Sequence, residues 1–293
     1  MELIYTVEWM QQVARQGLAE GSLIGLVPTM GALHEGHLSL IRAAQKQCRP
    51  VVVSLFVNPK QFGPHEDLEK YPRQMDADRT LLERQQVSYL FAPTAAEMYP
   101  DGFRTYVNVE GLGERLEGRS RAGHFRGVST VVLKLFEIVR PHFAYFGRKD
   151  AQQARVIRQM VRDLNLDTEV VVCPIVREVD GLAISSRNAY LKGEERRAAT
   201  VLYRALDAVR QEISQGERDA VRLVARVEKI IAAEPLASTD YAEIVDADTF
   251  EPVLHLRRSC LVLLAVFVGS TRLIDNLLVE EDESEEGSLR ISL

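Results

Sequence analysis

Short apolar segments alternate with amphipathic ones over the first 175 residues of the chain. Residues 23–27 are apolar, and an amphipathic stretch follows at 37–47. Residues 51–57 (VVVSLFV) are apolar without alternation, which is typical of a parallel strand covered on both faces. The alternation continues with helical patterns at 76–86, 128–139 and 151–164 and strand-like runs at 89–92, 142–146 and 170–175. Strands that alternate with helices over short loops predict a parallel sheet with right-handed crossovers.

The pattern changes after about residue 175. A polar loop leads to two helical patterns at 194–215 and 219–233, and Gly216 between them is a typical helix stop. Strand-like runs follow at 241–245 and 261–268, and the acidic run EEDESEEG comes near the end. We predict an α/β protein in three parts: a Rossmann-like domain at 1–175, a smaller α+β lid domain at 176–280 with a hinge near 174–178, and a disordered acidic tail at 281–293.

Composition and charge narrow the class of protein. Hydrophobic residues make up 46% and charged residues 27% of the chain, as in soluble globular proteins. A formal charge of −6 with scattered Lys and Arg argues against a nucleic-acid-binding surface. Three cysteines, Cys48, Cys173 and Cys260, lack C-x-x-C spacing and are predicted to be reduced thiols. The polar start and the absence of a long apolar run predict a soluble, cytoplasmic protein without a membrane partner.

Polar segments whose side chains could bind a ligand or take part in catalysis follow three of the predicted strands. In open parallel sheets, ligands bind beyond the carboxyl ends of the strands. The segment TMGALHEGH follows the run at 23–27, NPKQF follows 51–57, and GRKD follows 142–146. We therefore expect these three segments to contribute to one site.

Two histidines, His34 and His37, stand out in the first of these segments. Taken alone, an H-x-x-H pair is typical of surface residues at a helix cap, and a zinc site would need Cys or Glu partners that are not evident. After a strand and at the start of a helix, however, backbone N–H groups and the helix dipole favour phosphate oxygens. Gly31 and Gly36 allow the backbone to approach such a ligand closely. A histidine there can stabilise charge that builds on an α-phosphate.

The H-x-G-H arrangement resembles the HIGH motif of nucleotidyl-transferring α/β proteins, and the string PTMGALHEGH is similar to its form in the pantothenate synthetase family. Further stretches resemble the same family in the same order: SLFVNPKQF, EDLEKYPR, GHFRGV, FGRKDAQQ, VRE, DGLAISSRN and GSTRLIDN. The resemblance extends from about residue 24 to residue 276. It implies a ligase, pantoate–β-alanine ligase (AMP-forming), of pantothenate biosynthesis that acts as a homodimer with ATP as co-substrate and Mg²⁺.

The resemblance also implies a reaction in two halves. The pantoate carboxylate attacks the ATP α-phosphate and expels pyrophosphate, and the amine of β-alanine then attacks the pantoyl adenylate and expels AMP. Neither half needs a covalent enzyme intermediate, so catalysis is expected to depend on positioning and charge stabilisation.

Site residues are carried over from the matching motifs. His37, His34 and Lys149 are the expected catalytic residues, with His37 as proton donor. The expected ATP-binding residues are Met30, Gly31, Ala32, Leu33, His34, Glu35, Gly36, His37, Gly147, Arg148, Lys149, Asp150, Val176, Ile184, Ser185, Ser186 and Arg187.

The other substrates are assigned to two glutamines. Gln61 is expected to contact pantoate and β-alanine, and Gln153 to contact pantoate. No residue is assigned as a metal ligand, and Mg²⁺ on the ATP phosphates is expected near Asp150. Val131 and Val132 fit either a pantoate pocket or plain core, since they lie at helical spacing.

One position departs from the family pattern. The family more often carries Glu where this chain has Arg148, which adds a positive charge near the phosphates and removes a possible carboxylate beside the Mg²⁺. Some relatives carry a fused cytidylate kinase after this region, and we do not expect that activity here.

Two alternatives to this ligase stay open. One is another HIGH-motif nucleotidyltransferase that retains the nucleotide in its product; the segments NPKQF and KDAQQ argue against it because they suit a small hydroxy acid. The other is a nucleotide-binding module without activity, against which the intact His34, His37 and Lys149 argue.

Overall fold

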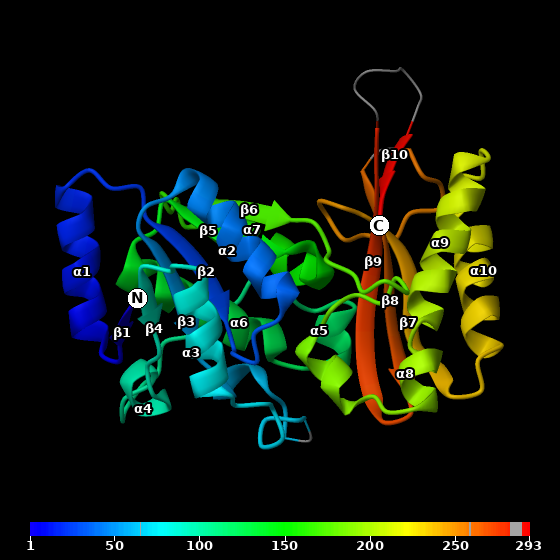
Figure 1. Cartoon of the computed structure of the whole chain (residues 1–293). Coiled ribbons are helices and arrows are strands. Elements are labelled where there is room, and N and C mark those ends of the chain that lie inside the picture. The colour runs from blue at the N-terminus through cyan, green and yellow to red at the C-terminus, as the bar shows by residue number, and fades with distance from the viewer. Residues whose placement is uncertain (65, 258, 282–288) are drawn as a thin grey trace. The chain divides into compact units, whose positions relative to one another are not determined.

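The computed structural model describes residues 1–64, 66–257, 259–281 and 289–293, and Figure 1 traces the chain. It divides into two compact units, Met1–Pro174 and Ile175–Leu293. The boundary expected at 175/176 lies next to this division. Within the described residues, no helix has both the length and the hydrophobicity that a membrane crossing requires.

A six-stranded sheet forms the centre of the first unit, with the strand order β1-β4-β3-β2-β5-β6. All neighbouring strands run parallel. The prediction of an α/β fold built on a parallel sheet is therefore confirmed. The strands are β1 (Glu2–Ile4), β2 (Gly25–Thr29), β3 (Val51–Leu55), β4 (Tyr89–Phe91), β5 (Phe143–Gly147) and β6 (Glu169–Cys173).

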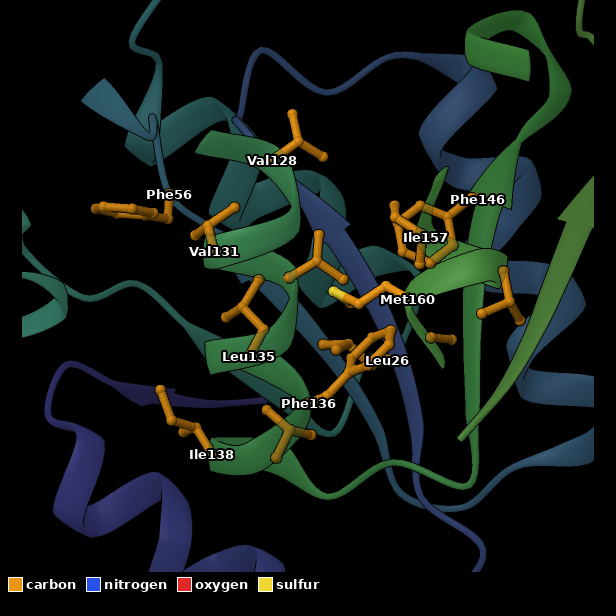
Figure 2. Close-up of a cluster of buried hydrophobic side chains, with 14 of the residues drawn as sticks. Leu26, Phe56, Val128, Val131, Leu135, Phe136, Ile138, Phe146, Ile157 and Met160 are labelled. Atoms are coloured by element: carbon orange, nitrogen blue, oxygen red, sulfur yellow. The ribbon is translucent and has the colours of Figure 1, made fainter. Parts of the chain in front are cut away.

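Two hydrophobic cores cover the two faces of this sheet, because successive side chains of a strand point to opposite faces. Leu26 of β2 packs in one core and its neighbour Val27 in the other. In Figure 2, Leu26 lies beside Phe136 and Met160 in the first core. That core also includes residues of the helices α1 (Val7–Ala19), α6 (His124–Val139) and α7 (Ala151–Asp163), whereas the second includes residues of α2 (Glu35–Gln47) and α3 (Met75–Arg84).

The sequence patterns did not predict β1 and α1. Strand β1 has three residues, which is too short for a periodic signal. Helix α1 fully buries Met10 and Ala14, and its Val7, Val13 and Leu18 pack against the first core while partly buried. Its start has a local cause, since the hydroxyl of Thr6 accepts a hydrogen bond from the N–H of Trp9. Shorter elements of this unit are α4 (Ala95–Met98), α5 (Glu117–Ser120) and the 3₁₀ turns η1 (Pro59–Gln61) and η2 (Arg148–Asp150).

The second unit contains a separate antiparallel sheet with the strand order β10-β9-β8-β7. Side chains of α9 and α10 share one hydrophobic core with this sheet, which confirms the predicted α+β arrangement. The elements are the 3₁₀ turn η3 (Ser186–Tyr190), α8 (Glu194–Ala198), α9 (Val201–Ser214), α10 (Ala220–Ala232), β7 (Ala237–Asp246), β8 (Cys260–Val268), β9 (Thr271–Glu281) and β10 (Leu289–Ser292).

Two predictions for this unit were wrong. The single helix expected at 194–215 is split into α8 and α9. The chain turns tightly between them, and the N–H and the hydroxyl of Thr200 both donate hydrogen bonds to the carbonyl of Arg197. The expected disordered tail at 281–293 includes β10, which pairs with β9 through Leu289 and Ile291 and packs these side chains against the core. The acidic residues 282–288 lie outside the described residues.

Candidate active site

Strands β2 and β5 are neighbours at the centre of the first sheet, and both carry predicted site residues at their carboxyl ends. After β2 the chain continues to β3 on one side, and after β5 it continues to β6 on the other. Such a reversal of strand order is where open α/β sheets bind ligands. The histidine loop, residues 30–37, follows β2, and η2 follows β5. The fold thus brings the TMGALHEGH and GRKD segments to one end of adjacent strands.

Backbone geometry in the histidine loop is unusual. Gly31 has φ +85° and Ala32 has φ +50°, and a left-handed conformation at a residue with a Cβ is uncommon. The hydroxyl of Thr29 accepts a hydrogen bond from the N–H of Gly31 over 3.3 Å. The carboxylate of Asp78, on α3, accepts bonds from the N–H groups of Ala32 and Leu33. Sequence reasoning missed Asp78, which lies 45 residues after Leu33 and outside every loop at the strand ends.

Helix α2 begins at Glu35, two residues earlier than the pattern predicted, with His34 as its N-cap. His37 therefore lies in the first helical turn. The rings of His34 and His37 stack with 4.0 Å between their centroids. The absence of a side chain at Gly36 allows this, because a Cβ there would come within 3.0 Å of the His34 ring.

The tautomer of His37 follows from its backbone contact. The N–H of His34 donates a hydrogen bond to Nδ1 of His37 over 3.3 Å. Nδ1 therefore carries no proton, and the proton of the neutral ring is on Nε2. His37 can thus donate a hydrogen bond from Nε2.

Both histidine rings are neutral near pH 7. Burial, and secondarily charge repulsion from Lys149, lower the pKa of His34 to about 4, against a smaller opposing effect of Asp150. Burial lowers the pKa of His37 to about 3, with His34 and Lys149 as the further causes. Since Lys149 acts on both rings, the three residues predicted to be catalytic lie in one electrostatic environment.

The loop after β5 supplies the charged groups. Gly147 ends the strand, Arg148, Lys149 and Asp150 form η2, and Asp150 is the N-cap of α7. Among the described residues, no group of three or more His, Cys, Asp or Glu side chains could hold a metal ion. Asp150 is the carboxylate that acts on His34 from this loop, and one carboxylate together with phosphate oxygens is a common Mg²⁺ environment.

Gln61 lies in η1 and contacts the histidine loop. Its side-chain oxygen accepts a hydrogen bond from Asn58 over 3.0 Å, and its amide N–H₂ contacts the sulfur of Met30 at 3.3 Å. Asn58 also bonds to the carbonyl of Gly127 and accepts from the hydroxyl of Tyr99. Asn58, the first residue of the NPKQF segment, is a functional candidate for which the sequence pattern predicted no role. Its position as N-cap of η1 was the available signal.

A histidine on α6 fixes the backbone of Gln61. Arg121 can only donate, so its contact with Nε2 of His124 at 3.1 Å makes this nitrogen the acceptor. Nδ1 of His124 then donates to the carbonyl of Gln61 over 2.8 Å. Arg121 in turn forms a two-bond ion pair with Glu66. A series of hydrogen bonds thus runs from Glu66 through Arg121 and His124 to the backbone carbonyl of Gln61.

Gln153 and the two valines have different surroundings. Gln153 is half-buried on α7, and its side chain makes no hydrogen bond with the part of the chain that the structure describes. Its neighbour Gln152 is buried and anchors the carbonyls of Leu112 and Arg115. Val131 and Val132 belong to the first hydrophobic core, and Val131 is labelled there in Figure 2.

The remaining predicted residues belong to the second unit. The N–H of Ile184 donates to the carbonyl of Val176 over 2.9 Å and closes a short hairpin. Ser185 follows as the N-cap of η3, and its hydroxyl accepts from the N–H of Arg187 over 3.3 Å. Ser186 is the first residue of η3. The structure thus joins Val176 and Ile184 and places Ser185, Ser186 and Arg187 on one turn.

Nearly the whole chain is similar to one protein family. A family model described as pantoate-beta-alanine ligase matches residues 2–278. A pantothenate synthetase from Caldicellulosiruptor saccharolyticus is 53% identical over 280 residues, which cover 96% of this chain and 100% of that protein.

Solved structures agree with this similarity. The crystal structure of pantothenate synthetase from Thermus thermophilus is 46% identical, covers 94% of this chain and 98% of that chain, and has a TM-score of 0.90. The crystal structure of pantoate-beta-alanine ligase from Francisella tularensis, complexed with beta-gamma ATP and beta-alanine, is 35% identical with a TM-score of 0.76. That comparison covers 94% of this chain and 97% of the other.

Proposed function

The chain belongs to the pantoate–β-alanine ligase family and is therefore a ligase of pantothenate biosynthesis, and we propose that its reaction proceeds through a pantoyl adenylate at the ends of β2 and β5. In the first half, a pantoate carboxylate oxygen bonds to the α-phosphorus of ATP, and pyrophosphate leaves with the electrons of the broken P–O bond. In the second half, the β-alanine nitrogen bonds to the acyl carbon and loses a proton, and AMP leaves with the electrons of the broken C–O bond.

The single observation that supports this proposal most is the effect of Lys149 on both histidines. One positive charge lowers the pKa of His34 and of His37, as expected if all three groups face one anionic ligand. The family resemblance supplies the ligand, ATP. We assign the histidine loop, together with Gly147, Arg148, Lys149 and Asp150, to its binding.

His37 and Lys149 would act differently on the α-phosphate. Nε2–H of His37 donates a hydrogen bond to an oxygen whose negative charge grows as the carboxylate attacks. Lys149 contributes a full positive charge to the same group. Asp150, together with the phosphate oxygens, would hold Mg²⁺, and the ion would supply further neutralisation of charge.

The organic substrates are assigned to neutral amides. Gln61 would contact pantoate and then β-alanine, and Gln153 would contact pantoate. An amide can bind a carboxylate or hydroxyl without an ion pair that would weaken the nucleophile. The half-buried side chain of Gln153 has its hydrogen-bonding groups unused among the described residues, which supports this role.

Ser185, Ser186 and Arg187 would bind the β- and γ-phosphates, with Val176 and Ile184 as the adjoining ATP contacts. Two hydroxyls and a guanidinium all donate hydrogen bonds to phosphate oxygens, and they lie on a single turn.

A homodimer in the cytoplasm completes the proposal. Three buried free thiols, Cys48, Cys173 and Cys260, suit a reducing compartment. Light scattering of the purified chain tests the oligomeric state, and a mass of one subunit would contradict it.

The test is an assay in which pantoate, ATP and β-alanine are omitted in turn. We expect exchange of labelled pyrophosphate into ATP to require pantoate but not β-alanine, and net AMP release to require all three. A product that retains the nucleotide would instead favour the other nucleotidyltransferases. Exchange without pantoate would contradict the acyl adenylate.

A further inference from the structure

Asp78 is a buried carboxylate on α3 to which the proposed reaction gives no role. We propose that Asp78 is a positioning residue for adenylation, which fixes the histidine loop by binding two of its backbone N–H groups. This inference rests on the proposed role of His37 in the reaction. The N–H of Ala32 donates to one carboxylate oxygen over 2.9 Å, and the N–H of Leu33 donates to the other over 2.7 Å.

A carboxylate suits this place because it has two acceptor oxygens and no donor when it is ionised. Each of the two adjacent N–H groups meets its own oxygen. An asparagine of the same shape would offer one oxygen and turn an N–H₂ group toward the other N–H. The pair of contacts therefore requires the charged residue.

The burial of Asp78 is costly without such a role. The residue is 1% exposed, and it forms no ion pair with any residue that the structure describes. Its two side-chain partners are the loop N–H groups, which only partly offset the cost of removing a carboxylate from water. Burial accordingly raises the pKa of Asp78, and the two backbone hydrogen bonds oppose that shift. A buried carboxylate whose side-chain hydrogen bonds, among the described residues, go to the loop assigned to ATP points to function.

The loop conformation explains what Asp78 holds in place. Ala32 has a positive φ of +50°, a conformation that costs free energy for a residue with a side chain. Gly31 lies close to both Asp78 and Leu55: a Cβ at Gly31 would be 3.1 Å from Oδ2 of Asp78 and 3.2 Å from the side chain of Leu55. The bonds to Ala32 and Leu33 thus stabilise a strained turn, and this turn sets where His34 caps α2.

A consequence concerns the phosphates. The N–H groups of Ala32 and Leu33 are already bonded to Asp78, so they are not available to ATP. The first N–H groups of α2, at Glu35 and Gly36, have no acceptor within the helix and take that role instead. The contribution of Ala32 and Leu33 to the site is therefore their backbone shape.

The experiment compares Asp78→Asn with Asp76→Asn in the full-length chain. Both residues lie in the first turn of α3, so both substitutions remove the same charge from the same helix end. Asp76 is exposed and serves as the matched control. Two quantities are measured: the rate of pantoate-dependent ATP–pyrophosphate exchange, and the ¹⁵N signals of His37, which report whether Nδ1 accepts a hydrogen bond and Nε2 carries the proton.

We expect Asp78→Asn to lower kcat for exchange by roughly 10- to 100-fold, because small displacements of catalytic groups have effects of this size. The His37 signals should shift toward a mixture of tautomers, and Asp76→Asn should match the unsubstituted protein in both measurements. Exchange within about twofold of normal in folded Asp78→Asn would overturn the proposal. So would a slow variant with unchanged His37 signals.

Asp78→Glu covers the case in which Asp78→Asn does not fold. Glu retains both acceptor oxygens but is longer by one methylene, so the loop is displaced rather than released. The exchange rate and the His37 signals should then change together, and a change in one alone would overturn the proposal. His37→Ala separates this inference from the proposed function. Normal exchange in His37→Ala would contradict the proposed function. Slow exchange in His37→Ala together with normal exchange in Asp78→Asn would contradict only the role of Asp78.

Discussion

The backbone N–H of His34 donates a hydrogen bond to Nδ1 of His37 over 3.3 Å. This contact fixes the tautomer of a partly buried, neutral imidazole and leaves Nε2–H as its hydrogen-bond donor. The family resemblance implies that His37 is a proton donor, and in the proposed mechanism the neutral ring would stabilise charge on the α-phosphate through a hydrogen bond from Nε2–H. The distinction can be measured.

Replacing His37 by Gln or by Asn tests which nitrogen acts. The amide nitrogen of Gln reaches about as far as Nε2, whereas that of Asn reaches only about as far as Nδ1. His37→Ala should lower the exchange rate by about a hundredfold or more, since the loss of one donor to a developing charge costs about 3 kcal/mol. His37→Gln should recover part of this loss and His37→Asn should not. If Asn restores activity better than Gln, the Nε2 assignment is wrong.

The charge of Lys149 should be visible in the titration of the two histidines. A positive neighbour disfavours the protonated ring, so Lys149→Met should raise the pKa of His34 above about 4 and that of His37 above about 3. Neither pKa should reach the ordinary 6.5, because burial is the larger cause for both. Histidine NMR titration of the ligand-free protein measures the shift.

The same variant should lower the exchange rate about a hundredfold. Lys134→Met is the control, because this α6 lysine lies over the ring of Phe103 and is not among the causes of either histidine shift. Unchanged histidine pKa values in Lys149→Met would show that the three groups do not share one environment.

The sequence predicted the parallel sheet because its strands are apolar on both faces. The run at 51–57 became β3, whose Val52 and Val53 pack in different cores. Motif positions at strand ends likewise predicted that His37 and Lys149 come together. Local pattern sufficed for both, since parallel strands place their carboxyl ends on one edge.

Contacts between distant segments could not be predicted in this way. The hydrogen bond from Ala32 to Asp78 joins residues 46 positions apart, and the ion pair of Arg177 with Asp275 joins residues 98 positions apart. Neither contact has a signature in the local sequence. Helix α1 was also missed, although its Val7, Met10, Val13 and Leu18 lie at helical spacing and pack at the first core. The sequence patterns therefore did not predict which polar side chains from distant segments form hydrogen bonds with the site loops.

Gly127 on α6 controls the placement of Gln61. A Cβ at Gly127 would be 2.7 Å from Cα of Gln61 and would also collide with the carbonyl of Lys60. Gly127→Ala should therefore push η1 away from α6 and raise the KM for pantoate by roughly tenfold or more, since misplaced binding groups have effects of this order. Steady-state kinetics with pantoate and ATP varied separately would show the effect mainly on pantoate.

Gly17→Ala is the matched control, because Gly17 lies within α1 and a Cβ there would make an ordinary 3.4 Å contact with Ile24. It should leave both KM values unchanged and stabilise the protein by about 0.5–1 kcal/mol, since Ala is the better helix former. A normal pantoate KM in Gly127→Ala would mean that η1 tolerates the displacement and that Gln61 is not held by this contact.

Arg177 and Asp275 form a two-bond ion pair at 2.7 and 3.0 Å within the second unit, with side chains 13% and 1% exposed. Arg177 also donates to the carbonyl of Gly181, so the pair attaches the hairpin before Ser185 to β9. Asp275→Asn leaves a largely buried guanidinium without its counter-charge and should lower the free energy of unfolding by about 3 kcal/mol. Urea unfolding, with hydrogen exchange of β8 and β9 amides as the local probe, measures the loss.

The double variant Arg177→Met/Asp275→Leu should recover most of that stability, because an apolar pair needs no compensation for lost hydration. Arg226→Ala removes a more exposed pair with Glu212 in the same unit and should cost less than about 1 kcal/mol. If the turn that begins at Ser185 binds phosphates, the double variant should still show a raised KM for ATP, because the hydrogen bonds that attach its hairpin to β9 are lost. Full stability together with a normal ATP KM would mean that the ion pair neither positions this turn nor contributes to binding.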